Sequence, residues 1–115
     1  MTQSPRMTLQ VQLVLRALLD DPAGEWYGLQ LCEETGLPSG TIYPIVARLE
    51  LLGWVESSWE DPSRHVAEGR PRRRYYRLTG DGAAQARAAL ARVRRPVKRP
   101  RFGAVTGIGI VGTAR

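Results

Sequence analysis

The stretch that decides the fold covers residues 39–53 and reads SGTIYPIVARLELLG. Apolar residues recur in it at the spacing of one helix face, namely at Ile42, Ile45, Val46, Leu49 and Leu52. Ser39 suits an N-cap and Gly53 suits a helix stop, so the pattern predicts a helix between them. Pro44 is expected in about the first turn, where backbone amides have no partner within the helix.

Two further helices are predicted before this stretch. Thr8 suits an N-cap for a helix that ends near Asp20, and its apolar stripe consists of Val11, Val14, Leu15 and Leu18. More apolar residues lie outside that stripe, at Leu9, Leu13, Ala17 and Leu19. They predict either a second apolar contact, such as a subunit interface, or a helix buried on two sides. A shorter helix over residues 27–34 is stopped by Gly36.

The hydrophobic period changes from helical to alternating after Gly53. Residues 54–59 alternate as one strand and residues 72–78 as a second, with Tyr76 and Leu78 turned toward the core. The intervening residues 60–71 are more than the usual hairpin loop of about 2 to 5 residues. We therefore expect a mobile, basic hairpin tip.

A last helix is predicted after the second strand. Thr79 suits its cap, and its narrow apolar stripe consists of Ala83, Ala86, Leu90 and Val93. The helix is expected to reach Arg95 and to end at Pro96. Residues 97–115 are rich in glycine and arginine without periodicity, so we expect a disordered basic tail.

The predicted order of elements is helix, helix, helix, two-stranded hairpin, helix. That order is typical of a winged helix-turn-helix, a mainly α fold with a small β-hairpin, followed here by a C-terminal helix. We expect a winged helix-turn-helix DNA-binding domain at residues 1–79, a dimerisation helix at 80–95 and the basic tail at 96–115.

Length and composition exclude several classes of protein. A chain of 115 residues with 43% hydrophobic and 24% charged residues is expected to form one globular domain. No apolar run approaches the roughly 20 residues of a membrane span, so we expect a cytoplasmic protein without a membrane partner. One Cys and one His exclude an internal disulfide and a tetrahedral Cys/His zinc site.

Charge is divided unevenly along the chain. Residues 1–60 hold 3 basic and 8 acidic side chains, whereas residues 61–115 hold 14 and 3. A basic segment in a chain of pI near 10.4 indicates a polyanionic partner, with nucleic acid ahead of anionic membrane. The sequence offers no nucleophile with an evident base, no phosphate-binding loop and no metal cluster, so we expect neither an enzyme nor a cofactor.

Four runs of sequence carry a specific resemblance: YGL at 27–29, GLPSGTIYPIVARLE at 36–50, GWVE at 53–56 and GRPRRRYYRLT at 69–79. With them the chain resembles the PadR family of transcriptional regulators over about residues 9–95. The resemblance implies a homodimeric bacterial repressor that occludes a promoter and dimerises chiefly through its first and last helices. It also implies release from DNA by a small molecule in many members, although no effector is identified for this sequence.

Candidate contact residues follow from these patterns. On the third helix, side chains off the apolar stripe are expected to meet double-stranded DNA, which we expect to carry an inverted-repeat operator; they are Ser39, Thr41, Tyr43 and Arg48. At the hairpin tip, Arg70, Arg72 and Arg73 are expected to contact phosphates or the minor groove. The predicted dimer interface consists of Leu9, Leu13, Ala86, Leu90 and Val93.

Each of these assignments has an alternative. The third helix could present a solvated face, with Tyr43 packed against the second helix and Arg48 paired with an acidic residue. An arginine run on a strand could simply discourage edge pairing. The runner-up function is a winged helix that binds RNA or a partner protein without sequence-specific binding to duplex DNA.

Overall fold

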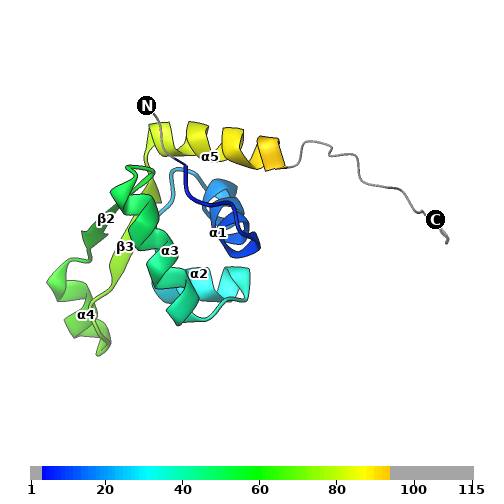
Figure 1. Ribbon diagram of the computed structural model, residues 1–115. Helices are drawn as coiled ribbons and strands as arrows, with labels where there is room; N and C mark the ends of the chain where they lie inside the picture. Colours follow the sequence, from blue (N-terminus) through cyan, green and yellow to red (C-terminus); the bar gives the residue numbers. More distant parts are fainter. Residues whose placement is uncertain (1–3, 94–115) are drawn as a thin grey trace.

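The computed structural model describes residues 4–93, and it has the winged helix-turn-helix fold that the sequence predicts (Figure 1). Its elements are α1 (Leu9–Asp20), β1 (Trp26–Tyr27), α2 (Gly28–Thr35), α3 (Ser39–Leu51), β2 (Val55–Trp59), α4 (Pro62–Glu68), β3 (Arg74–Leu78) and α5 (Gly80–Val93). The predicted end of the last helix at Arg95 and the predicted tail at 96–115 lie outside the described residues. No helix within residues 4–93 combines the length and the apolar character that crossing a membrane would require.

The first helix is buried on two sides. Its predicted cap is confirmed, because the Thr8 Oγ1 accepts a hydrogen bond from the Val11 amide at 3.2 Å. The predicted stripe lies in the core, and so do Ala17 and, in part, Leu19. Leu9 is 67% exposed, so only part of the additional apolar surface of α1 is open to a second contact.

The third helix begins one residue earlier than its predicted cap implies. Pro38 is the N-cap, and its carbonyl accepts hydrogen bonds from the amides of Thr41 and Ile42. Ser39 is thus the first helical residue and caps nothing, which corrects the predicted cap. Pro44 is the sixth helical residue, beyond the first turn, and it lacks the amide that would bond to the Gly40 carbonyl.

The sheet has three antiparallel strands in the order β1-β3-β2. Val55 pairs with Leu78 and Trp59 with Arg74, which confirms the predicted hairpin, although the second strand begins at Arg74 rather than at Arg72. The sequence analysis missed β1, in which Tyr27 pairs with Tyr75. A two-residue strand offers no alternation to detect.

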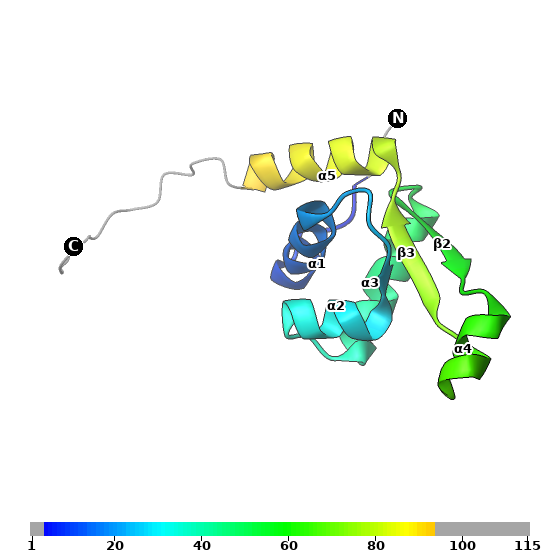
Figure 2. The same cartoon turned by 180° about the vertical axis from the view of Figure 1, so that it is seen from behind.

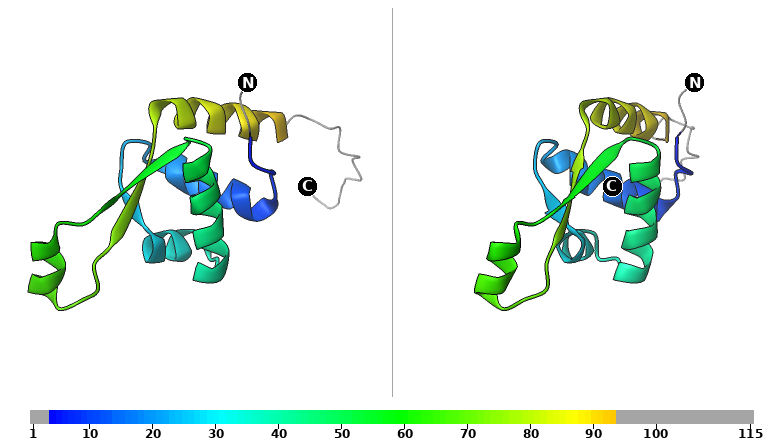
Figure 3. Two further views of the ribbon diagram at one scale, coloured as in Figure 1. Left: turned by 60° about the vertical axis from the view of Figure 1, so that its left-hand side comes forward. Right: turned by 90° about the vertical axis from the view of Figure 1, so that its left-hand side faces the viewer.

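The hairpin tip contains a helix instead of the predicted loop. Asp61 caps α4 by accepting the Ser63 amide at 3.0 Å, and Pro62 occupies the first helical position. Gly69 ends the helix in the left-handed conformation at φ 63°, which suits a residue without a Cβ. Figure 3 shows α4 at the end of the hairpin, away from the helical core.

The last helix packs on α1, and in the view of Figure 2 α5 lies above that helix. Its predicted cap is confirmed, because the Thr79 Oγ1 accepts the Gly82 amide at 2.8 Å. Its buried side chains join the same core as those of α1; they are Ala83, Ala86, Ala89 and Leu90. A methyl group at Gly82 would lie 2.0 Å from the Trp54 carbonyl oxygen, so only glycine fits there.

Candidate nucleic-acid interface

The outer face of α3 is open to solvent. Figure 1 looks onto this helix, with the hairpin to one side and α1 and α2 behind it. Of the four α3 residues predicted to contact DNA, Ser39 and Arg48 are exposed and Thr41 is half-buried. Tyr43 is 44% exposed, so part of its ring is available to a ligand.

The buried part of Tyr43 packs against the start of α2. A methyl group at Gly28 would lie 2.1 Å from the Tyr43 hydroxyl oxygen. The tyrosine can therefore occupy this position only because Gly28 has no side chain. The expected DNA contact and its alternative, packing on the second helix, are therefore compatible in one side chain.

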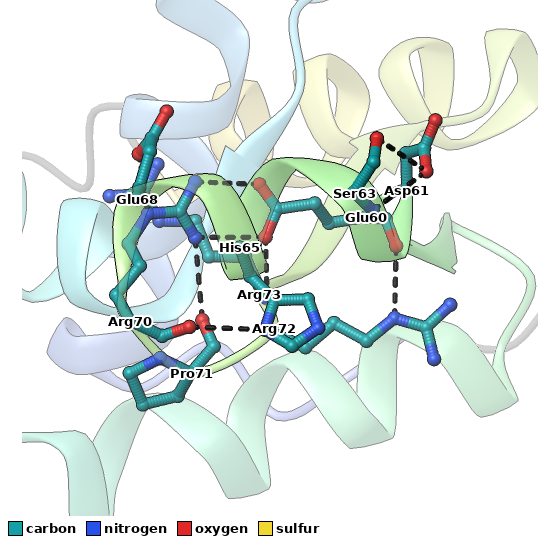
Figure 4. Close-up of polar contacts among 9 residues, drawn as sticks. All are labelled: Glu60, Asp61, Ser63, His65, Glu68, Arg70, Pro71, Arg72 and Arg73. Carbon is teal, nitrogen blue, oxygen red and sulfur yellow. Dashed lines mark hydrogen bonds and ion pairs between the residues drawn. The ribbon is translucent and has the colours of Figure 1, made fainter.

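The base of the hairpin tip is closed by Glu60 (Figure 4). This residue is only 4% exposed, and its two carboxylate oxygens accept from the Arg70 guanidinium at 2.8 and 2.7 Å. Its Oε1 also accepts the Arg73 amide at 3.1 Å, and its own amide donates to the Arg73 carbonyl at 2.8 Å. We call Glu60 and Arg70 the wing latch.

The wing latch fixes the charge state of its carboxylate. The hydrogen bonds from Arg70 are the main cause that lowers the pKa of Glu60 to about 2. Arg70 also donates from Nε to Glu68 at 2.7 Å, so its charge faces two carboxylates. The guanidinium of Arg70 is thus paired within the wing, and its predicted phosphate contact stays a prediction.

The other two predicted wing arginines are held by aromatic rings. The Arg72 guanidinium lies 5.5 Å from the centre of the Trp59 ring, and its Nε donates to the Glu60 carbonyl at 2.9 Å. The Arg73 guanidinium lies 3.9 Å from the centre of the Tyr27 ring. Stacking on a ring leaves the planar edge of a guanidinium free to donate to an anion.

Two neighbouring arginines are paired with acidic side chains, although Arg74 also lies over the Trp59 ring, 5.0 Å from its centre. Arg74 donates to the Ser57 hydroxyl at 2.7 Å and lies 3.8 Å from the Glu50 carboxylate. Arg77 pairs with Glu56 across the hairpin at 2.9 Å. Arg72 and Arg73 thus differ from their neighbours, because neither guanidinium forms an ion pair with a carboxylate of residues 4–93.

A cavity of about 500 Å³ joins the wing to the helices. Four of the residues predicted to contact DNA line it, namely Tyr43, Arg70, Arg72 and Arg73. Ser39, Thr41 and Arg48 are not among the lining residues. The sequence analysis missed the aromatic lining from Tyr27 and Trp59, although their positions next to the two basic strand ends could have indicated it.

The residues predicted for a subunit interface have different surroundings. Leu9 and Val93 are exposed and Leu13 is half-buried. Ala86 and Leu90 lie in the core of the chain itself. The argument that placed these two in an interface is wrong, because α1 already covers the stripe that was thought to have no partner.

Sequence and structural comparisons point to regulators of transcription. The sequence model described as the Transcriptional regulator PadR-like family matches residues 17–88. No curated protein sequence matches the chain.

Solved structures share the fold. A MarR family transcriptional regulator from Silicibacter pomeroyi DSS-3 is 22% identical at a TM-score of 0.55, over 76% of this chain and 55% of that one. A PadR family transcriptional regulator from Eggerthella lenta DSM 2243 is 28% identical at a TM-score of 0.55, over 74% and 77%. Overoxidized AbfR bound to DNA is 24% identical at a TM-score of 0.57, over 73% and 55%. The match thus spans about half the length of the first and third of these proteins.

Proposed function

Because this chain belongs to the PadR-like family of transcriptional regulators, which bind DNA and are not enzymes, we propose that it represses transcription as a homodimer that occludes a promoter. One observation carries the proposal. The open face of α3 and two ring-stacked arginines of the wing border the same side of the molecule, where Tyr43, Arg72 and Arg73 line one cavity. Double-stranded DNA is the polyanion that fits this arrangement, because its major groove admits an α-helix while a basic hairpin lies along the phosphates beside it.

In the proposed complex the two elements have different tasks. The third helix enters the major groove, where Ser39, Thr41, Tyr43 and Arg48 contact the duplex. Arg72 and Arg73 donate to phosphates, which position the protein without reading sequence. Because the ligand is chromosomal DNA, the place of action is the cytoplasm of a bacterial cell.

The proposed dimer uses the exposed apolar residues of α1 and α5. Leu9, Leu13 and Val93 are open or half-open to solvent and belong to the two helices that pack together. Two copies related by a two-fold axis would meet an inverted-repeat operator with half-sites about one turn, or roughly 34 Å, apart. Sedimentation equilibrium at micromolar concentration tests this, with a dimer expected for the native chain and a monomer for Leu9→Asp.

The salt dependence of DNA binding tests the role of the wing. Replacing Arg72 with alanine should lower the slope of log K against log salt by about 0.9, the value for one lost phosphate contact. Arg77→Ala is the matched control, since it removes the same charge from an arginine that Glu56 already neutralises. An equal change in both variants would assign the effect to net charge and would contradict the proposed contact.

A further inference from the structure

The exposed ridge of α3 carries no side chain that can form a hydrogen bond. Residues at i, i+4, i+7 and i+11 form its centre, and all four are exposed; they are Gly40, Pro44, Ala47 and Leu51. Leu51 is 86% exposed. We call these four residues the apolar ridge. α3 is thus apolar both where it meets the core and where it faces outward.

Polar side chains border the apolar ridge on both sides. At 100° per residue, Tyr43 and Arg48 are about 140° apart around the helix, with the ridge between them. Tyr43 lies on the side of the hairpin, where it lines the cavity with the wing arginines. Arg48 lies on the opposite side and is exposed. The donors and acceptors of this face are therefore at its edges.

Pro44 lies outside the core cluster of the protein. It is exposed, so it contributes nothing to the core. It also interrupts the backbone hydrogen bonds of α3, because it cannot donate to the Gly40 carbonyl. An exposed residue that removes a backbone donor from its own helix fits a role at the outer surface better than a role in the core.

We propose that the apolar ridge reads the C5-methyl groups of thymines in the major groove. This rests on the proposed function of α3. The floor of the major groove presents hydrogen-bonding atoms and one apolar group, the thymine methyl, and apolar side chains contact that group. Pro44 and Ala47 are then the specificity-determining residues at the centre of each half-site, and Arg48 supplies hydrogen bonds at its edge. The arginines beside the ridge favour DNA over an apolar partner protein as its occupant.

The test begins with selection of duplexes from a random pool by the full chain. Each thymine of the selected half-site is then replaced by uracil, which keeps base pairing and removes only the methyl group. We expect about a fourfold loss of affinity at one or more positions, the factor that corresponds to ~0.8 kcal/mol for one buried methylene-sized group. Uracil outside the half-sites should have no effect.

Variants of the ridge connect the methyl groups to named residues. Pro44→Ala restores a backbone donor and helix propensity, so it is not expected to fail by misfolding. It should reduce the thymine-to-uracil affinity ratio toward 1 at one position, and Ala47→Gly should do so at another. Ala88→Gly is the matched control for the glycine, because Ala88 is an exposed helical alanine on α5; its ratio should equal that of the native chain.

The outcomes separate this inference from the proposed function. If duplexes are selected and uracil is tolerated at every position, methyl readout is wrong while sequence-specific binding stands. If no duplex is selected and binding is equal for all sequences, the proposed function fails, and a partner protein becomes the occupant of the ridge.

Discussion

The two ends of the hairpin are held by different forces. At the α5 end, buried apolar side chains such as Leu78 pack in the core, and Gly82 lies close against the Trp54 backbone. At the α4 end, none of the α4 residues is buried, and the structure depends on the wing latch and on arginines stacked over rings. The stability of the α5 end should therefore depend on side-chain volume, and the stability of the α4 end on charge and pH.

The largest expected effect is at the apolar end. Gly82→Ala places a methyl group against backbone atoms that cannot move aside, so we expect it to lower the free energy of unfolding by about 3 kcal/mol, at the upper end of the usual cost of overpacking. Urea denaturation measures this. Gly80→Ala is the matched control, because nothing lies within 4 Å of a methyl group there. Equal stability of the two variants would contradict the proposed tight contact.

Replacing Glu60 with glutamine should loosen the polar end and leave the apolar end intact. The variant keeps the shape of the side chain but removes the charge that faces Arg70. We expect faster hydrogen exchange of the amides in α4 and unchanged exchange in α1. Glu68→Gln is the control, because that carboxylate also bonds to Arg70 but is exposed, and exposed pairs contribute about 0 to 1 kcal/mol. Faster exchange in both helices would mean that the two ends are not independent.

Acid should loosen the α4 end in the same way as the Glu60→Gln substitution. The folded pKa of Glu60 is about 2, below its ordinary 4.5, so its ionised form stabilises the wing. That contribution is complete above pH 4.5 and is lost as the pH falls from 4.5 toward 2. The fluorescence of Trp59, which is 54% exposed beside the latch, should change in this interval. Glu60→Gln should lack the change, and a transition that persists in this variant would assign it to another group.

The smallest effect on stability is expected between the two ends. Gly28→Ala puts a methyl group onto the Tyr43 hydroxyl, but this is the far end of a partly exposed side chain that can swing outward. We expect the free energy of unfolding to change by less than about 1 kcal/mol, with a clear loss of DNA affinity. In a double-mutant cycle with Tyr43→Ala, the second substitution should add no further loss of affinity. Additive losses would show that Gly28 acts independently of the tyrosine.

Periodicity predicted the apolar end well and the polar end poorly. The stripes of α1 and α3 and the inward turn of Tyr76 and Leu78 were visible because burial follows a fixed spacing. Helix α4 buries nothing, so no stripe indicates it, although Asp61, Pro62 and Gly69 are the residues that start and stop helices. Those three signals could have predicted it.

The candidate site was predictable in its residues but not in their partners. The arginine run was evident, yet nothing local indicates that Arg70 pairs with Glu60 ten positions earlier, since α4 folds between them. Similarly, the stripe of α5 showed that Ala86 and Leu90 are buried but not against which helix. Long-range pairing depends on tertiary geometry, which spacing along one element does not contain.

The junction around Thr79 has a mechanical consequence. The Thr79 amide donates to the Trp54 carbonyl at 3.0 Å, and its hydroxyl donates to the Gly53 carbonyl at 2.9 Å. Gly82 packs against the same Trp54 carbonyl. The end of α3, the start of β2 and the start of α5 are therefore joined by close contacts at one point. The direction of α5 therefore fixes the direction of α3. In a dimer, a change in the distance between the two α3 helices would therefore have to come from a change in how the two copies of the chain join, because α3 and α5 move together within each copy.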